Sequence, residues 1–388
     1  MKAHERARGL RRTPQLLWEV LARGTYSFVY DCVPLTVSGM SAAKRLNLLR
    51  AGGNLLHRRL TPWGWPLHMQ FEWTNYCNLR CPVCPLGAGT LNRTAQAMDP
   101  ALYARIMDEV GPYLLTASLW VWGESLLHPK LSEMLHITRK HPVLTLLSTN
   151  GFGLDNAKIQ DALLDAPPTH LIVAIDGLTD ETNSCYRPGA KLGPVLEGVR
   201  QLAERKRRSG AKLPVLHMRY IVMKQNQHEY AKVEDFARRH AFEMLTLRSL
   251  SIIDNDKADE MVAELLPDTS ERRAYGYRDG QRVHRNDFIC QQPFWFPSVL
   301  ADGTVVACEQ DFNAQHAMGR VTSSRSFEKV WRSNQARDVR RLIRDAGDTV
   351  SFCRNCPFAD RPTSSCSLET RYLGSSRPDD GRCPGSGA

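Results

Sequence analysis

The sequence predicts an α/β fold in which a parallel sheet curves into a partial barrel and a cysteine-rich region follows. The first observation is that six apolar runs alternate with helical segments between residues 66 and 250. The second is that this alternation stops near residue 250 and six of the eleven cysteines come later. Strands that alternate with helices pair in parallel through right-handed crossovers. Side chains that follow such strands gather at one edge of the sheet, where ligands bind.

The expected elements follow the apolar periodicity of the chain. Asp99 and Pro100 mark the start of the first helix after the first strand, because Asp caps a helix and Pro suits its first turn. Asp302 and Gly303 lie between two apolar runs and indicate a β-hairpin in the later region. The expected strands are residues 67–74, 116–122, 144–148, 171–175, 215–223 and 244–247. The expected helices are residues 100–112, 129–140, 155–165, 192–208 and 227–240.

Charge divides the chain unevenly. The net charge of the 388 residues is +10, and residues 1–60 hold eleven Lys or Arg against three Asp or Glu, a net of +8. The body of the protein is therefore nearly neutral. We expect residues 1–65 to form a basic arm of helix fragments, either a solubilising extension or a contact for an anionic membrane surface, nucleic acid or an acidic partner. The other expected units are a barrel over 66–250, a cysteine-rich domain over 251–360 and a flexible tail over 361–388.

The chain shows no apolar run of membrane-spanning length and no signal-peptide pattern, so the expected location is cytoplasmic, with peripheral membrane contact as an option. Eleven cysteines then need an explanation, because structural disulfides are rare in that compartment. Clustered cysteines in such proteins more often bind metal or take part in redox chemistry.

Three of the cysteines follow the first expected strand directly. Cys77, Cys81 and Cys84 have the spacing C-x3-C-x2-C, which suits three corners of a cubane cluster. The fourth iron is left open for a substrate or cofactor, as catalysis requires. A zinc site is the alternative, but it would need a fourth ligand, and none follows Cys84 closely.

At this loop the chain resembles the radical S-adenosylmethionine (SAM) superfamily. The resemblance covers about residues 67–250 and implies a partial (β/α)6 barrel with a [4Fe–4S] cluster on Cys77, Cys81 and Cys84. It also implies that SAM chelates the open iron and is cleaved to a 5′-deoxyadenosyl radical, which abstracts a hydrogen atom from the substrate. The electron would come from a donor such as flavodoxin or ferredoxin.

Further matches to this superfamily follow the later strands. Trp122-Gly123-Glu124-Ser125 resembles the Gly-Gly-Glu-Pro motif and departs from it at Trp122 and Ser125. The glycine lets the backbone approach the cofactor, and the carboxylate accepts hydrogen bonds from the cofactor's ammonium group. By resemblance, Ser148 and Asn150 contact the ribose and Arg187 pairs with the carboxylate of SAM. The implied cofactor-binding residues are Gly123, Glu124, Ser148, Asn150, Asp176 and Arg187.

The C-terminal cysteines resemble the SPASM and twitch extensions of the same superfamily. The implied ligands of one auxiliary [4Fe–4S] cluster are Cys290, Cys308, Cys353 and Cys356. Zinc is the alternative for this site, because two distant cysteine pairs are also a common zinc framework. The roles of Cys185, Cys366 and Cys383 stay open, since their spacing fits neither set.

Three functions are compatible with these features. The first is a radical SAM enzyme of oxidoreductase type that acts on a small molecule such as a sugar or natural product, and this reading is favoured. The second is a radical SAM maturase that modifies a ribosomal peptide; such enzymes often carry a winged-helix segment near the N-terminus, and residues 1–65 show no clear one. The third, a non-enzymatic Fe–S or zinc protein that binds nucleic acid, is disfavoured by Glu124 and the open three-cysteine loop. The catalytic side chains that act on the substrate are undetermined at this level.

Overall fold

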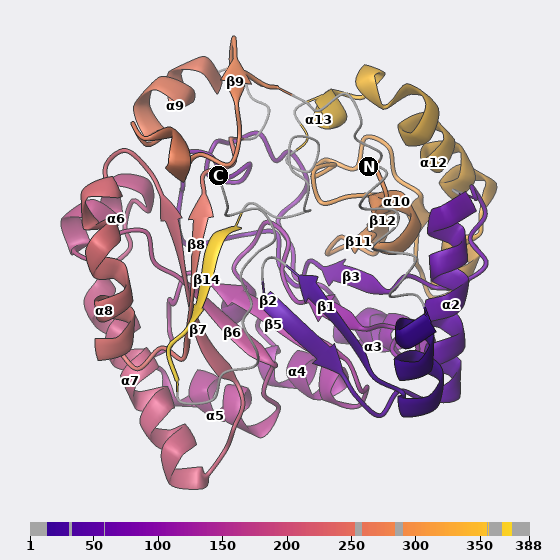
Figure 1. Ribbon diagram of the computed structural model, residues 1–388, viewed down its shortest axis with the longest axis horizontal. Helices are drawn as coiled ribbons and strands as arrows, with labels where there is room; N and C mark the ends of the chain where they lie inside the picture. The colour runs from indigo at the N-terminus through magenta and orange to yellow at the C-terminus, as the bar shows by residue number, and fades with distance from the viewer. Residues whose placement is uncertain are drawn as a thin grey trace.

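A curved sheet of ten strands forms the centre of the protein, with helices along its outer face (Figure 1). The computed structural model describes residues 14–30, 33–57, 59–252, 258–283, 290–354, 356 and 367–374. The strand order is β13-β12-β11-β3-β4-β5-β6-β7-β8-β14. Among the described residues, no helix is long and apolar enough to cross a membrane.

The six central strands are parallel and are joined by outer helices, which confirms the predicted partial barrel. The strands are β3 (His68–Phe71), β4 (Thr116–Ser118), β5 (Leu144–Thr149), β6 (His170–Ala174), β7 (Val215–Val222) and β8 (Met244–Ser249). The helices are α3 (Pro100–Val110), α4 (Leu131–Arg139), α5 (Ala157–Asp165), α6 (Asp180–Tyr186), α7 (Leu192–Ser209) and α8 (Val233–Arg239).

Helix α3 begins as the sequence predicts, because the Asp99 side chain accepts a hydrogen bond from the Leu102 amide (3.2 Å) and Pro100 occupies the first turn. Helix α6 was not predicted from the sequence. It is only seven residues long, and Thr179 and Thr182 form a capping box at its start. Its polar sequence hides the apolar periodicity that identifies longer helices.

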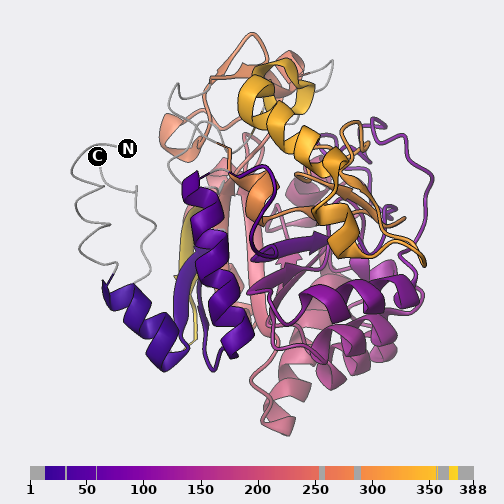
Figure 2. The ribbon, with the colours of Figure 1, turned by 90° about the vertical axis from the view of Figure 1, so that its right-hand side faces the viewer.

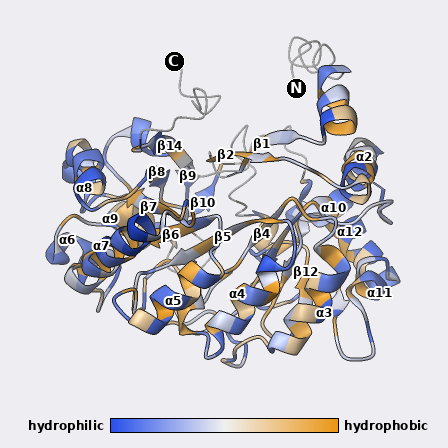
Figure 3. Cartoon of the chain, turned by 90° about the horizontal axis from the view of Figure 1, so that it is seen from below, coloured by the Kyte–Doolittle hydropathy of each residue, from blue (hydrophilic) through white to orange (hydrophobic). Residues whose placement is uncertain are grey.

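The two faces of the sheet are both apolar but pack against different partners. Leu171 and Val173 belong to the large core between the sheet and the outer helices, whose apolar sides face inward (Figure 3). Ile172 lies between them in sequence and points to the opposite, inner face, as the two-residue period of a strand requires. The parallel strands are therefore buried on both sides.

The inner face is covered by a hairpin from the N-terminal region. Strands β1 (Tyr26–Tyr30) and β2 (Val33–Val37) pair antiparallel and are followed by helix α2 (Ala42–His57). The buried side chains of Val33 and Leu35 pack in one cluster with Leu146, Ile172 and Met244 of the barrel, and the hairpin lies over the open side of the barrel (Figures 1 and 2).

This hairpin differs from the sequence expectation of helix fragments in residues 1–65. The strands are short, and their apolar side chains face a barrel that forms later in the sequence, so no local pattern identifies them. Residues 26–30 and 33–57 are consequently part of the barrel body and not of a detachable arm.

The cysteine-rich region continues the same sheet beyond β3. Strand β11 (Ser298–Val299) pairs parallel with β3, and β12 (Thr304–Val306) returns antiparallel through the predicted turn, where Gly303 has φ +88°. The other elements are α9 (Ala258–Leu265), β9 (Tyr277–Arg278), β10 (Gln281–Arg282), α10 (Gln292–Trp295), β13 (Gly319–Arg320), α11 (Phe327–Trp331), α12 (Asn334–Ala346) and α13 (Ser351–Arg354).

The end of the described chain also differs from expectation. The sequence predicts a flexible tail from residue 361, but β14 (Ser367–Tyr372) pairs antiparallel with β8 and extends the sheet. Arg371 donates a hydrogen bond to Glu234 (2.6 Å), and Thr370 and Thr246 share a hydrogen bond (3.0 Å). These partners on α8 and β8 lie more than 100 positions away in the sequence, so the strand cannot be recognised from its own residues.

Candidate active site

The loop that follows β3 holds Cys77, Cys81 and Cys84. The three thiols lie close enough that each pair interacts electrostatically. The Leu79 amide and the Asn150 side-chain amide point at the Cys77 sulfur, at 3.4 and 3.5 Å. The structure thus brings together the three predicted cluster ligands.

These residues fit a [4Fe–4S] cluster held at three corners. Three thiolate donors on one loop suit iron in such a cluster, and N–H groups directed at the sulfurs are a usual feature of Fe–S sites. The amides of Leu86 and Gly87 similarly point at Cys84. Within the described ranges, no three His, Cys, Asp or Glu side chains are arranged to hold a single metal ion.

Gly123 and Glu124 lie beside the cluster loop, at the end of β4. A Cβ atom on Gly123 would lie 2.1 Å from the Thr74 carbonyl oxygen, so only glycine lets the two segments approach this closely. The Glu124 carboxylate accepts hydrogen bonds from the amides of Leu126 (3.0 Å) and Asn150 (2.7 Å). Burial raises the pKa of Glu124, and these amide donors lower it in turn.

Ser148 and Asn150 lie at the end of β5, on the next strand of the barrel. Ser148 is half-buried. The Asn150 side-chain amide donates to Asn78 (2.8 Å) in addition to the Cys77 sulfur, and its oxygen accepts from the Phe152 amide (2.9 Å). Asn150 therefore connects the end of β5 to the cysteine loop.

Asp176 and Arg187 form a buried ion pair after β6. Arg187 Nε and Nη2 each lie 2.6 Å from the same Asp176 oxygen, while the other oxygen accepts from the Ile221 amide (2.7 Å). The guanidinium also interacts electrostatically with Cys81 and Cys84. The structure thus places Arg187 beside the cluster loop, but two of its three nitrogens are directed at Asp176.

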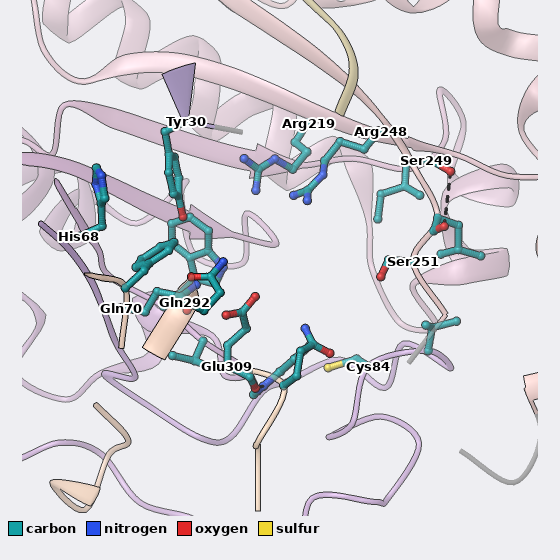
Figure 4. Close-up of a pocket in the computed structure, with 18 of the residues that line it drawn as sticks. Tyr30, His68, Gln70, Cys84, Arg219, Arg248, Ser249, Ser251, Gln292 and Glu309 are labelled. Atoms are coloured by element: carbon teal, nitrogen blue, oxygen red, sulfur yellow. Dashed lines mark hydrogen bonds between the residues drawn. The ribbon is translucent and has the colours of Figure 1, made fainter. Parts of the chain in front are cut away.

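A cavity of about 350 Å³ runs from the cysteine loop into the barrel (Figure 4). Cys84 and Tyr186 line it at the loop, and Arg219 and Arg248 line it from β7 and β8. The hairpin β1–β2 forms one wall, and residues next to Cys308 form another. The aromatic side chains on its walls are Tyr26, Phe28, Tyr30, Trp120, Trp122, Tyr186, Tyr275, Trp295 and Phe296.

The second cysteine set lies on the opposite side of the cavity from the barrel strands. Cys308 interacts electrostatically with Cys290 and Cys356, and Cys353 interacts with Cys290. Cys308 and Cys356 are buried, and the other two are half-buried. The structure thus brings all four predicted ligands together, and four thiols provide the donor set of a closed Fe–S site.

Two direct contacts join the cysteine loop region to the second set. Glu72 at the end of β3 is fully buried and forms a double hydrogen bond with Arg93, at 2.8 and 2.6 Å. Arg93 Nε also donates to the Phe312 carbonyl (2.6 Å). Trp122 Nε1 donates to the carbonyl of Glu309 (2.8 Å), next to Cys308. Trp122, one of the departures from the superfamily motif, therefore connects the two sites.

Sequence reasoning missed most residues of the cavity wall. Arg219 and Arg248 belong to no motif, and each lies in the middle of an apolar run. A charged residue at an inward position of a parallel strand is the signal that could have identified them. The hairpin residues gave no comparable signal. Cys185 is exposed on α6, and Cys366 and Cys383 lie outside the described residues.

Comparisons with known families agree with this geometry. Residues 71–237 match the model of the radical SAM superfamily, and residues 290–357 match the SPASM model, an iron–sulfur cluster-binding domain. The first range contains the three loop cysteines, and the second contains the four cysteines of the other set.

Two curated relatives match part of the chain. The PqqA peptide cyclase of Ruegeria pomeroyi is 30% identical over 118 residues, which is 30% of each chain. The PqqA peptide cyclase of Gluconobacter oxydans is 27% identical over 117 residues, which is 30% of this chain and 32% of the relative. The match thus spans about a third of the length of these relatives.

Solved structures show the same fold. Streptococcus suis SuiB bound to S-adenosylmethionine superposes with a TM-score of 0.56 at 16% identity, over 81% of this chain and 77% of SuiB. SuiB bound to its precursor peptide SuiA gives a TM-score of 0.55 at 15% identity, over 81% and 76%. A radical SAM domain binds a [4Fe–4S] cluster and SAM, and a SPASM domain binds auxiliary Fe–S clusters. The chain belongs to the radical SAM superfamily and carries a C-terminal SPASM domain.

Proposed function

We propose that this radical SAM enzyme modifies an amino-acid residue of a peptide substrate. The observation that carries the proposal is the single cavity that reaches from Cys84 on the cluster loop to the chain beside Cys308. A substrate group in this cavity would lie between the two cysteine sets. The curated relatives, which are peptide cyclases, favour a peptide over the small molecule that the sequence favours.

When bound at the open cluster, SAM would supply the radical chemistry that removes a hydrogen atom from the substrate. The residues of this chain bind and orient. The three loop cysteines hold the cluster, and Asn150 orients Cys77 through its amide. We assign SAM binding to Gly123, Glu124, Ser148, Asn150, Asp176 and Arg187. The Glu124 carboxylate accepts two backbone amides and a hydrogen bond from the Thr149 side chain, which leaves one of its four lone-pair sites for an ammonium group.

Water exclusion is the second contribution of the chain. The aromatic side chains of the hairpin form a wall of the cavity on the open side of the barrel, and Tyr30 is held there by a hydrogen bond with Ser118 (3.0 Å). An aromatic wall that limits the access of water protects a reactive intermediate from side reactions. The four-cysteine set beside this cavity supports an oxidative outcome, in which the substrate loses electrons as well as hydrogen.

The test uses protein reconstituted anaerobically with its clusters, SAM and dithionite. Peptides encoded by short reading frames beside the gene are synthesised and added. We expect a peptide product that has lost a pair of hydrogen atoms, together with 5′-deoxyadenosine, and deuterium at the reacting position should appear in the 5′-deoxyadenosine. If no such peptide stimulates SAM cleavage while a small metabolite does, the peptide assignment is wrong.

A small-molecule substrate is the second candidate, and the shape of the cavity favours it. A volume of about 350 Å³ lies in the usual range for small-ligand sites, and the hairpin bounds it on one side. A non-enzymatic nucleic-acid-binding role lacks such support, because the net charge outside residues 1–60 is close to zero.

Two partners complete the proposal. An electron donor such as flavodoxin or ferredoxin is required to reduce the cluster. An anionic membrane surface is the partner we assign to the N-terminal helical segment, residues 14–23, where Leu17, Trp18 and Leu21 are 39, 64 and 50% exposed. This segment projects from the body (Figure 3), and the sequence before it is basic, which is the composition of interfacial helices.

A further inference from the structure

We propose that the substrate carries a carboxylate attached to an apolar or aromatic body, and that Arg219 and Arg248 bind this carboxylate inside the barrel. The proposal names the substrate class of the site described above and rests on the function proposed for it. Neither the superfamily motifs nor the cysteine sets include these two residues.

The two arginines share the inner face of the sheet. In the parallel pairing of β7 with β8, Arg219 is opposite Thr246 and Arg248 is opposite Ile221. Residues two positions apart on a strand, and residues opposite each other on neighbouring strands, point to the same side. Figure 4 shows both side chains extending into the cavity, with Cys84 and Glu309 on the other side. An anion between the strands and the cysteine loop would therefore meet both guanidinium groups.

The charge balance of the cavity favours an anion. Apart from Cys84, which would be a cluster ligand, the described lining residues with a formally charged side chain are Arg219, Arg248 and Glu309. The wall formed by β7 and β8 therefore carries two positive charges and no negative one. Arg219 is only 6% exposed, and a buried charge is costly unless it is compensated. The proposal does not require either guanidinium to be unpaired, because each has five N–H donors and can bind a ligand in addition to a protein partner.

The planar fork of a guanidinium matches a carboxylate, and two forks can hold both of its oxygens. The rest of the ligand would face aromatic rings. Trp120 lies beside Arg219, with the guanidinium carbon 5.9 Å from the ring centroid, and Tyr30 and Phe296 pack edge to face at 5.6 Å. Such walls bind the apolar body of a ligand through contact area and leave the orientation to the charged groups.

A pair of matched probes tests the proposal without radical chemistry. The full-length protein is reconstituted with its clusters and saturated with SAM in the absence of a reductant, and 3-phenylpropanoate and 3-phenylpropanamide are titrated calorimetrically. The two probes differ in charge but hardly in shape. We expect the acid to bind about tenfold or more tightly than the amide, because a charge-assisted pair is made only by the acid. Equal affinities, or no binding of the acid, would overturn the proposal.

Three further arms sharpen the result. Arg219→Gln and Arg248→Gln should each reduce the preference for the acid, while Arg200→Gln on the exposed face of α7 should not change it. Inorganic phosphate should bind more weakly than the acid; tighter phosphate binding would contradict the carboxylate assignment. If Arg219→Gln does not fold, the comparison of acid and amide binding to the wild-type protein and the Arg248→Gln variant still test the proposal. Failure of the peptide assay leaves this binding result unaffected, so the two proposals fail independently.

Discussion

The two cysteine sets of this protein differ in the number of ligands and in how the fold positions them. The first set lies on one eight-residue stretch of loop after a barrel strand, and it offers three thiols. The second set is assembled from three segments spread over residues 290–356, and it offers four thiols. An incomplete set leaves a position for a cofactor, whereas a complete set suits an electron-transfer or structural cluster.

The two cysteine sets also differ in the residues that surround them. Glu124, Asn150 and Arg187 approach the first set from the segments that follow β4, β5 and α6. The second set lies in a region of short strands and helices that continues the same sheet through β11. Binding groups therefore concentrate around the open set, and the closed set contributes to the cavity mainly through the chain next to Cys308.

The largest expected effect comes from removing the open set. The Cys77→Ala, Cys81→Ala, Cys84→Ala triple variant should lose SAM cleavage completely, because no other described residues provide that three-thiol loop. Its iron content should fall from on the order of eight to about four atoms per chain, since the closed cluster is retained. Iron analysis measures the cluster content, and the yield of 5′-deoxyadenosine measures SAM cleavage. Undiminished SAM cleavage in this variant would contradict the assignment of the loop.

Removing one ligand of the four-cysteine set should spare SAM cleavage, unlike removal of the three loop cysteines. Cys353→Ala should lower the iron content to about four atoms per chain and abolish product formation, while basal SAM cleavage changes little. Cys185→Ala is the matched control, because this exposed cysteine belongs to neither set. The variant without Cys77, Cys81 and Cys84 retains only the four-cysteine set. If it contains zinc in place of iron, the auxiliary Fe–S cluster is refuted and the domain is stabilised by zinc instead.

The contact between the two regions should be important for stability. Arg93→Ala leaves the fully buried Glu72 carboxylate with only the Ala301 amide (3.0 Å) and without its charged partner, which should lower the free energy of unfolding by about 3–5 kcal/mol. Burial raises the pKa of Glu72, so a proton relieves the penalty, and the loss should be smaller at acidic pH than at neutral pH. Urea unfolding at several pH values measures this. The exposed Arg200→Ala should behave like wild type; a similar loss there would show that burial is not the cause.

A more local change should affect the open set alone. Gly123→Ala forces the end of β4 away from Thr74 and so displaces the Glu124 carboxylate. SAM affinity should fall by about tenfold or more, because small displacements of binding groups are costly. Gly52→Ala is the control, since a Cβ there meets no atom within 4 Å. Equilibrium dialysis with SAM provides the measurement, and unchanged affinity would mean that Glu124 does not bind the cofactor.

The smallest effect is expected outside both regions. Trp18→Ser with Leu21→Ser should reduce binding to vesicles of anionic phospholipid roughly tenfold and leave SAM cleavage unchanged. Phe152→Ser is the control, because Phe152 is 54% exposed elsewhere on the surface. Substitution is needed here because deleting residues 1–60 would also remove the cavity wall formed by β1 and β2. The membrane assignment is wrong if the wild-type protein shows no salt-sensitive vesicle binding.

The sequence predicted the parts of the protein whose signals are local. The six parallel strands and the helix that begins at Pro100 follow from periodicity and capping. The three loop cysteines were singled out by their spacing, and the four C-terminal cysteines by their resemblance to SPASM and twitch extensions. The strands of the hairpin and β14 were missed because their partners are distant in sequence. Arg219 and Arg248 were missed because their role depends on which face of the strand is inward, which only the assembled barrel defines.

The position of the hairpin has a consequence for the order in which the protein can be built. During synthesis Val33 and Leu35 leave the ribosome before any of the strands they pack against, and Met244 follows more than 200 residues later. Until then these apolar side chains have no native surface to cover, and the nascent chain exposes a strand pair that can join other chains. We therefore expect the hairpin to dock late, and co-expressed chaperones to raise the soluble yield of the full chain more than that of a Val33→Thr, Leu35→Thr variant.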